Sequence, residues 1–232
     1  MDTRRQTSQP AAAGHRASGP YLDAPPRSSS RWRWAKNIPA TEGIIEVLHR
    51  YCYTPSAMVS NDAFAQLLRP LTAADRSQLE DFDCGDEVMN RFLKRWALTE
   101  QARRLSRTYL IRQPLPCPGF LTMSAAQVAR EWSGLPRREL RYPVASAMFI
   151  GRLGVDVRYQ GSGLGRSLVR AARLLAFRLP IGCRFVALEV DEANSRAIGL
   201  YRSEGFWVPR GYEPDRGRLL MLYDLATTRP AD

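Results

Sequence analysis

The sequence predicts a mixed α/β domain in which helices cover a central β-sheet. Short apolar or alternating runs, typical of strands, come between longer segments whose apolar residues recur at helical spacing. In the second half of the chain, one strand-like run ends in a glycine-rich turn that leads directly into a helical segment. Elements mixed along a chain in this way bury their apolar faces against one another, as a sheet flanked by helices.

Folded structure is expected to begin near Ala65, and the strands and helices then follow one another along the chain. The expected strands are Gln66–Leu71, Thr108–Arg112, Phe120–Val128, Ala147–Val157, Phe185–Val190 and Leu219–Leu225. The expected helices are 73–81, 86–105, Gly163–Phe177 and Asn194–Glu204, and a polar loop occupies 129–145. Thr72 is a good N-cap for the first of these helices.

The long helix 86–105 is expected to be amphipathic. At i, i+3 and i+4 spacing, one face carries Val88, Met89, Phe92, Leu93, Trp96 and Ala97. Arg91, Lys94 and Arg95 fall on the opposite face.

The chain is strongly basic. Its 232 residues include 34 Lys and Arg, of which only Lys36 and Lys94 are lysines, against 23 Asp and Glu, for a net charge of +11. This excess favours an anionic partner, either nucleic acid or a phosphorylated cofactor. The alternative is that arginine serves throughout as an ordinary solvated cation.

Cysteine and histidine usage excludes several kinds of site. The four cysteines are scattered without a CxxC pair, which is typical neither of a disulfide framework nor of a zinc site. The two histidines, His15 and His49, lie outside the expected domain, so that no histidine metal site or Ser/His/Asp triad is expected within it. No apolar stretch reaches the roughly 18 residues of a membrane-spanning helix. We therefore expect a soluble, cytoplasmic protein without a metal.

The chain is expected to divide into an N-terminal extension, residues 1–57, a domain, 66–226, and a short tail, 227–232. Residues 1–40 are rich in Ser, Pro, Ala and Arg, a composition typical of disorder. Within them, Arg31-Trp32-Arg33-Trp34 alternates cations with aromatic residues, as segments that bind nucleic acids or membrane surfaces do. Met58 is an alternative start, which would place the whole extension outside the protein.

The glycine-rich turn has the properties of a phosphate-binding loop. It reads Gln160-Gly161-Ser162-Gly163-Leu164-Gly165-Arg166, and its glycines allow consecutive backbone N–H groups to point into one concavity. The start of the following helix adds a partial positive charge that favours a pyrophosphate, and Arg158 and Arg166 are expected to be mobile cations at the rim. The loop matches neither a Walker A motif nor a Rossmann fingerprint. The alternative is a tight strand–helix turn.

A second motif follows about thirty residues later. Residues 194–206 read N-x-x-A-x-x-L-Y-x-x-x-G-F, and the first loop reads Q-x-x-G-x-G. In this order, with a helix and a strand between them, the two motifs resemble those of the GNAT N-acetyltransferase superfamily. The resemblance implies an acetyl-CoA-dependent enzyme with a mixed, mostly antiparallel sheet that is splayed between its fourth and fifth strands.

The resemblance also assigns roles to residues. Leu153, Gly154 and Val155 would bind the pantetheine arm of acetyl-CoA through their backbone. The loop from Gln160 to Arg166 would hold the pyrophosphate, and Asn194 would support the cofactor from the opposite strand. Tyr201 would protonate the leaving thiolate, unless it is simply a packed tyrosine of its helix. Glu189 and Asp191 stay open as candidate general bases.

Further motifs resemble one branch of this superfamily, the toxins of type II toxin–antitoxin modules. They are Phe82-Asp83-Cys84-Gly85, Leu105-Ser106-Arg107-Thr108-Tyr109, Gly119-Phe120-Leu121-Thr122-Met123-Ser124-Ala125 and Ile150-Gly151-Arg152-Leu153-Gly154-Val155-Asp156. The resemblance implies acetylation of the α-amine of aminoacyl-tRNA, a cognate antitoxin as partner, and a homodimer.

Two groups of basic residues are candidates for contact with tRNA. The first is Arg91, Lys94, Arg95, Arg103, Arg104 and Arg107, and the second is Arg137 and Arg138 with their neighbours Arg130 and Arg141. A basic surface would make tRNA binding fall steeply with salt. The alternative for both groups is a solvated charged face.

Two other functions stay open. The stretch 188–194 looks more like general GNAT enzymes than like the toxins, so that a housekeeping enzyme acting on a protein N-terminus or a small amine is the main alternative. A catalytically silent domain that binds a partner is the other, although the intact loop and Tyr201 speak against it.

Overall fold

The computed structural model of the chain describes residues 68–111 and 116–227. The expected extension, 1–57, and residues 228–232 of the expected tail lie outside these ranges. The described residues belong to one compact unit.

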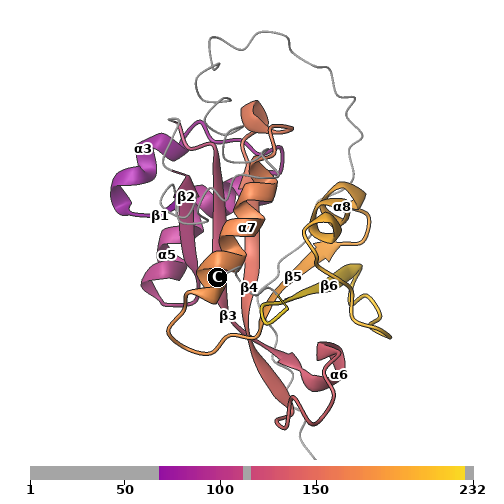
Figure 1. Ribbon diagram of the computed structural model, residues 1–232. Helices are drawn as coiled ribbons and strands as arrows, with labels where there is room; N and C mark the ends of the chain where they lie inside the picture. Colours follow the sequence, from indigo (N-terminus) through magenta and orange to yellow (C-terminus); the bar gives the residue numbers. More distant parts are fainter. Residues whose placement is uncertain (1–67, 112–115, 228–232) are drawn as a thin grey trace, which may run out of the picture. The chain divides into compact units, whose positions relative to one another are not determined.

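The described residues form a six-stranded sheet whose strands lie side by side in chain order (Figure 1). Every neighbouring pair is antiparallel except β4 and β5, which are parallel. The strands are β1 (Leu68–Pro70), β2 (Arg107–Ile111), β3 (Gly119–Ala129), β4 (Val144–Val155), β5 (Phe185–Asp191) and β6 (Arg218–Asp224). This confirms the mixed, mostly antiparallel sheet expected from the sequence.

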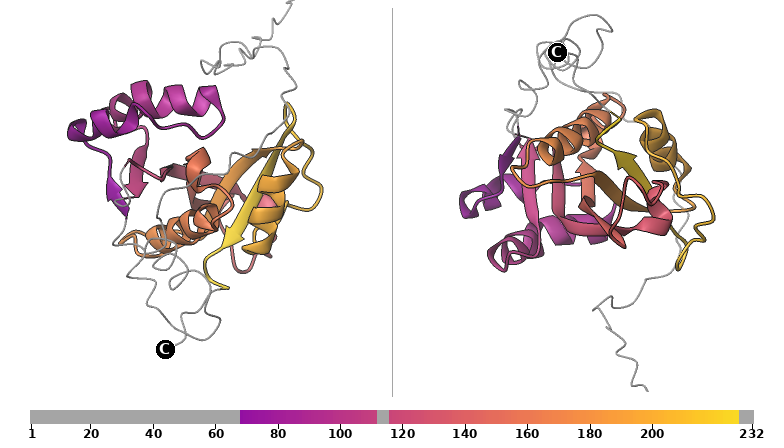
Figure 2. Two further views of the ribbon diagram at one scale, coloured as in Figure 1. Left: turned by 90° about the horizontal axis from the view of Figure 1, so that it is seen from above. Right: turned by 60° about the horizontal axis from the view of Figure 1, so that its bottom comes forward.

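Helices cover both faces of the sheet (Figure 2). On one face lie the short helices η1 (Ala73–Asp75), α3 (Arg76–Leu79), α4 (Glu87–Arg91), η2 (Phe92–Trp96) and α5 (Ala97–Ala102). The other face carries α7 (Leu164–Phe177), whose Leu168, Val169 and Ala172 are fully buried. The remaining helices are α6 (Arg130–Ser133), η3 (Val157–Tyr159) and α8 (Ser195–Ser203).

The expected long helix is interrupted by a π-helical turn, η2. Phe92, Leu93 and Ala97 are buried as expected, but Val88 is 61% exposed and Trp96 is 56% exposed. The prediction of one continuous apolar face was therefore wrong at these two residues. A π-helical turn holds an extra residue, so that the face defined by a period of 3.6 residues does not continue through it.

The segment expected to be a polar loop, 129–145, contains α6 and packs on the sheet. Trp132 meets Tyr212 edge to face, with ring centroids 5.4 Å apart. Leu140 is buried in a cluster with Val128 of β3 and Phe185 of β5. These apolar contacts fix the turn between β3 and β4.

A β-bulge at Gly151 divides β4 into two parts. Thr122 of β3 pairs with Arg152, and the next residue, Met123, pairs with Ile150, so that Gly151 is an extra residue in β4. The bulge bends the strand and increases its twist. Beyond the bulge, Gly154 lies against the fully buried ring of Phe120, where a Cβ atom would come 2.5 Å from a ring carbon.

This contact predicts that Gly154→Ala destabilises the domain, by about 1–3 kcal/mol, because the buried Phe120 ring has no room to move. Gly151→Ala is the matched control on the same strand. Its Cβ would meet its nearest neighbour at 3.9 Å, and we expect a change below about 0.5 kcal/mol. Urea unfolding of both variants measures the difference, and equal losses would contradict the steric explanation.

Candidate active site

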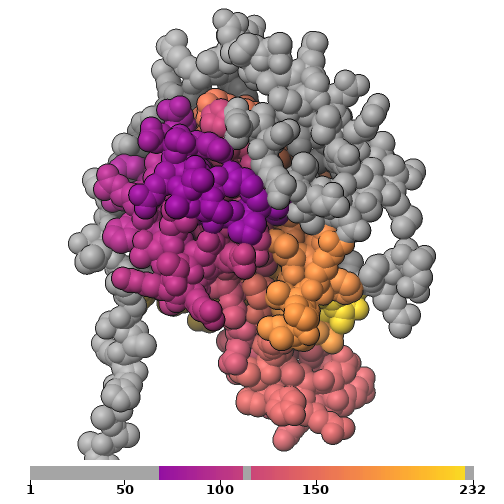
Figure 3. Space-filling model, turned by 90° about the vertical axis from the view of Figure 1, so that its left-hand side faces the viewer, coloured from indigo at the N-terminus to yellow at the C-terminus, as the bar shows by residue number. Residues whose placement is uncertain are grey.

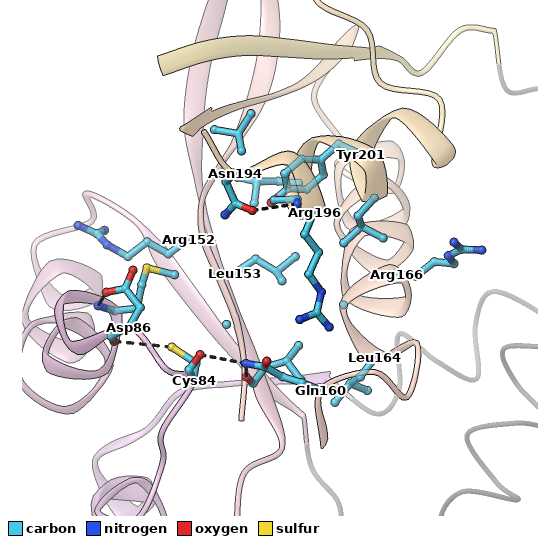
Figure 4. A pocket seen from close by; sticks show the side chains of 18 of the residues that line it. Cys84, Asp86, Arg152, Leu153, Gln160, Leu164, Arg166, Asn194, Arg196 and Tyr201 are labelled. Carbon is cyan, nitrogen blue, oxygen red and sulfur yellow. Dashed lines mark hydrogen bonds between the residues drawn. The ribbon is translucent and has the colours of Figure 1, made fainter. Parts of the chain in front are cut away.

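The site lies where β4 and β5 separate. The two strands pair only from Ala147 to Ile150 and from Phe185 to Leu188, and they diverge beyond these residues. A cavity of about 1170 Å³ opens there (Figure 4). Its walls come from both strands, the start of α7, α8 and residues 84–89. This separation confirms the splay expected between the fourth and fifth strands.

The unpaired part of β4 forms one wall. Leu153, Gly154 and Val155 line the cavity, and β5 does not cover their edge of the sheet. An uncovered strand edge presents backbone N–H and C=O groups that an extended ligand with amide groups can pair with. The three residues are thus together, in a geometry that suits a pantetheine arm.

The glycine-rich loop forms the end of the cavity next to α7. Gly161 and Gly163 have φ angles of 83° and 85°, in the left-handed region that favours glycine. A Cβ atom on either glycine would meet nothing within 4 Å. Gly163 is the N-cap of the 14-residue helix α7, whose first N–H groups have no partner within the helix. The loop therefore combines open space, free N–H groups and a helix N-terminus.

Gln160, Gly161, Gly163, Leu164, Gly165 and Arg166 all line the cavity. Ser162 does not, and its hydroxyl donates to the backbone oxygen of Tyr159 at 2.6 Å. Gly165 is not required by the packing of the protein itself, because a Cβ there would meet Leu200 at 3.5 Å and Val155 at 3.9 Å, which are ordinary contacts.

A buried carboxylate anchors the loop to the helical layer. Asp156 is fully buried and accepts hydrogen bonds from the backbone N–H of Asp83 at 3.1 Å and of Arg158 at 3.0 Å. The Arg158 guanidinium also donates to both of its carboxylate oxygens, at 2.7 and 2.8 Å. Gln160 adds a second link, since its side-chain amide donates to the backbone oxygen of Cys84 at 2.9 Å. Arg158 is therefore a fixed partner of Asp156, where the sequence analysis expected a mobile cation.

These contacts determine the charge of Asp156. Burial alone would raise the pKa of this carboxyl, but the hydrogen bonds from Arg158 and from the Asp83 N–H outweigh it and lower the pKa below its ordinary value. Asp156 is thus ionised at neutral pH.

Two residues of α8 face the cavity from the opposite side. The side-chain oxygen of Asn194 accepts a hydrogen bond from the Ala197 N–H at 3.0 Å and so caps α8. Tyr201 packs on Phe206, with ring centroids 5.9 Å apart, and also lines the cavity. Burial raises the pKa of Tyr201 to about 12, so that the phenol keeps its proton at neutral pH. Tyr201 is thus both a packed tyrosine and a group that faces the cavity.

One buried carboxylate holds three arginines of α7. The oxygens of Glu204 lie 3.3 Å from Arg166, 2.9 Å from Arg170 and 3.5 Å from Arg173. Arg166 points away from the middle of the cavity (Figure 4). It is therefore a paired residue, where a mobile cation was expected.

Both candidate general bases, Glu189 and Asp191, line the cavity. Asp191 accepts a hydrogen bond from the Ala193 N–H at 2.9 Å, which gives it a structural role at the end of β5. Glu189 is exposed. Asp191 is exposed as well, so that only this hydrogen bond distinguishes the two carboxylates.

The candidate tRNA-binding residues lie outside the cavity, and all are exposed except Arg130, which is half-buried and donates to the backbone oxygen of Arg141 at 3.3 Å. The first group belongs to α4, η2, the turn after α5 and the start of β2, on the face drawn from indigo to magenta in Figure 3. It consists of Arg91, Lys94, Arg95, Arg103, Arg104 and Arg107. The second group, Arg137 and Arg138, follows α6. The structure leaves both groups open to solvent.

Several cavity residues were not singled out from the sequence. Those with charged or sulfur-containing side chains are Cys84, Asp86, Met89, Arg152, Arg170, Arg196 and Arg218. Arg196 lies inside the second motif, at a position that the motif leaves unspecified. Arg152 lies inside a quoted motif, and its guanidinium stacks 3.7 Å from the centre of the Phe92 ring. Neither position carries a charge signal that distinguishes it from the many other arginines of the chain.

Within residues 68–111 and 116–227, no group of three or more His, Cys, Asp and Glu residues is placed to hold a metal ion. In the same part of the chain, no helix is long and apolar enough to cross a membrane.

The fold and the motifs define a class of protein. Residues 125–206 match the family described as the acetyltransferase (GNAT) family. Residues 125–206 are therefore similar to a GNAT acetyltransferase, and the sheet with its splayed strands has the GNAT fold.

Individual proteins that this chain resembles have narrower names than the family. A tRNA-acetylating toxin of Mycobacterium tuberculosis is 28% identical over 132 residues, which cover 56% of this chain and 79% of that protein. A structure of AtaTR bound with acetyl-CoA is 26% identical, with a TM-score of 0.54, and covers 69% of this chain and 94% of that one. A structure of AtaT complexed with acetyl-methionyl-tRNAfMet is 23% identical, with a TM-score of 0.57, and covers 69% of this chain and 95% of that one.

The anchoring of the loop predicts a pH-dependent loss of stability in Asp156→Asn. We expect the variant to lose about 1–3 kcal/mol at pH 7, because an amide cannot replace a buried carboxylate that accepts four hydrogen bonds. A carboxyl whose pKa is lowered by folding stabilises the protein above its unfolded pKa, near 3.9, and loses that contribution as the pH falls through the folded value.

The difference between wild type and Asp156→Asn is therefore expected to be constant above about pH 5 and to shrink below about pH 4. Urea unfolding at several pH values measures it. Asp81→Asn, at an exposed residue nearby, is the control. A difference that persists unchanged at low pH would rule out ionised Asp156 as its origin.

Proposed function

We propose that the protein transfers the acetyl group of acetyl-CoA to the α-amine of aminoacyl-tRNA, and that it acts as a translation-blocking toxin. One observation carries the proposal: the cavity between the diverging strands joins a phosphate-type loop at one end to a protonated tyrosine on the facing helix. A thioester cofactor with a phosphorylated end and an amide-containing arm matches this cavity, since the phosphates suit the loop and the reacting thioester suits a proton donor.

The residues that would hold acetyl-CoA fit it chemically. The free N–H groups from Gly161 to Arg166 and the dipole of α7 suit a pyrophosphate. The uncovered edge at Leu153, Gly154 and Val155 suits the two amides of pantetheine. The open space beside Gly161 and Gly163, together with a Gly165 that packing does not require, leaves room for the ligand to approach the backbone. Asn194 would line the opposite side.

Acetyl-CoA supplies an activated acetyl group. As the amine nitrogen forms the new C–N bond, the C–S bond breaks, the ammonium loses a proton and the thiolate gains one. Tyr201 would donate the proton to sulfur, since its phenol is protonated at neutral pH and faces the cavity. The amine needs little help from a base if its pKa lies near the 7.7–8.0 that is typical of α-amino groups, well below that of lysine. Glu189 is then the remaining carboxylate that could take the proton through water.

The acceptor is inferred from two lines of support. The relative from Mycobacterium tuberculosis is named for acetylating tRNA, and the chain spans most of its length. The exposed arginines on and after α4 to α5 supply the basic surface that a tRNA acceptor stem requires. A toxin of this kind requires a neutralising antitoxin, which we propose as the protein partner, and charged tRNA places the reaction in the cytoplasm. The homodimer stays a prediction, as does the extent of the domain, 66–226.

Tyr201→Phe is expected to lower turnover by at least about ten-fold while the Kd for acetyl-CoA stays within about two-fold, because only the proton donor is removed. Steady-state rates, together with calorimetric titration of acetyl-CoA, separate the two effects. Phe206→Leu, which alters the packing of the Tyr201 ring and keeps its hydroxyl, is the control. Full turnover in Tyr201→Phe would assign the proton transfer to water or to another group.

The acceptor is tested by acetyl transfer from radiolabelled acetyl-CoA to total charged tRNA. We expect label on charged tRNA, none on deacylated tRNA, and a rate that falls steeply as salt is raised from about 50 to 200 mM. If a protein that binds acetyl-CoA leaves charged tRNA unlabelled, the tRNA substrate is wrong. Labelling of peptides with free N-termini, or of small amines, would then support the housekeeping alternative.

A further inference from the structure

Arg196 reaches into the cavity from the first turn of α8. It is the second residue of that helix, it is exposed, and it lines the cavity. Its side chain extends across the opening toward the end of the cavity that carries Gln160 and Leu164 (Figure 4). This is the end at which α7 begins.

Three of the four other arginines that line the cavity are held by protein groups, as is Arg158 at the base of the loop, and the fourth, Arg218, lies at the start of β6. Arg166 and Arg170 contact Glu204, and Arg158 is bound by Asp156. Arg152 stacks on Phe92 and lies 3.9 Å from a Glu100 oxygen. Within the described residues, Arg196 has no such ion pair or side-chain hydrogen bond.

The direction of Arg196 brings its positive charge toward a second positive group. The start of α7 carries a partial positive charge and unpaired N–H groups, and a guanidinium that faces it is repelled. A phosphate between the two would satisfy both, because the N–H groups can donate from one side and the planar guanidinium from the other.

We propose that Arg196 binds a phosphate of acetyl-CoA from the side opposite the glycine-rich loop, and so determines much of the affinity for the cofactor. The proposal rests on the proposed function, because it assumes that the ligand of the cavity is acetyl-CoA. Coenzyme A carries a pyrophosphate and a 3′-phosphate, and both have the chemistry that Arg196 would recognise.

The experiment is calorimetric titration of the full chain with CoA, 3′-dephospho-CoA and pantetheine. We expect Arg196→Ala to weaken CoA binding by about 10- to 100-fold, the range for a lost charge-assisted contact, and Arg196→Lys to weaken it less, because the charge is kept and the paired donors are lost. Arg202→Ala is the matched control. It removes the same charge from an exposed residue of the same helix that does not line the cavity, and we expect its Kd to stay within about two-fold.

The ligands distinguish the two phosphates. An equal loss with CoA and 3′-dephospho-CoA assigns the contact to the pyrophosphate, and a loss confined to CoA assigns it to the 3′-phosphate. Pantetheine binding is expected to be the same in all variants. Equal CoA affinity of Arg196→Ala and Arg202→Ala would overturn the inference and leave the proposed function standing. Failure of the wild-type protein to bind CoA would overturn the proposed function and the inference together.

Discussion

The separation of β4 from β5 is the constraint on which the site depends. Two parallel strands that stayed paired along their whole length would close the sheet and bury their amide groups in each other. Here the pairing stops at Ile150 and Leu188, and the cavity takes the place of the missing hydrogen bonds. The loop that begins α7 follows β4, and α8 follows β5, so that both helices start at the edge of this opening. The chemistry of the site therefore follows from an incomplete sheet.

Buried carboxylates decide which arginines of this basic chain are available to a ligand. Asp156 and Glu204 are buried and bind Arg158 and the three arginines of α7. Removing such a carboxylate would leave cations close together without compensation. These arginines stabilise the loop and the helix, whereas Lys94 and Arg95 of η2 and the arginines after α5 remain for an anionic partner. Arg91 of α4 is paired with Glu87 at 2.9 Å. Net charge alone makes no such distinction.

The sequence was informative about elements and less informative about side-chain partners. Strand and helix periodicity predicted the strands along the chain, and the resemblance carried by the two glycine-containing motifs implied the splay between β4 and β5. The periodicity was wrong at Trp96, because no periodicity of apolar residues reveals where a π-helical turn will insert an extra residue, and at Val88, which lies in α4, a helix without a buried residue. It missed α6, whose four residues are too few to show a period. The link between the loop and the helical layer could not be predicted either, because Asp156 accepts a hydrogen bond from the N–H of Asp83, 73 positions away in the chain.

The bulge at Gly151 divides β4 into two parts in which the alternation of side chains between the faces of the sheet is reversed. Before it, Met148 and Ile150 face α7, and Ala147 and Phe149 face the other layer. After it, Leu153 and Val155 face α7, while Arg152 and Gly154 meet the phenylalanines of the other layer. Even-numbered and odd-numbered positions thus exchange faces at one glycine. The loss of one residue between the bulge and the loop would therefore exchange the two faces again, and would turn a residue of the cavity wall toward the helical layer.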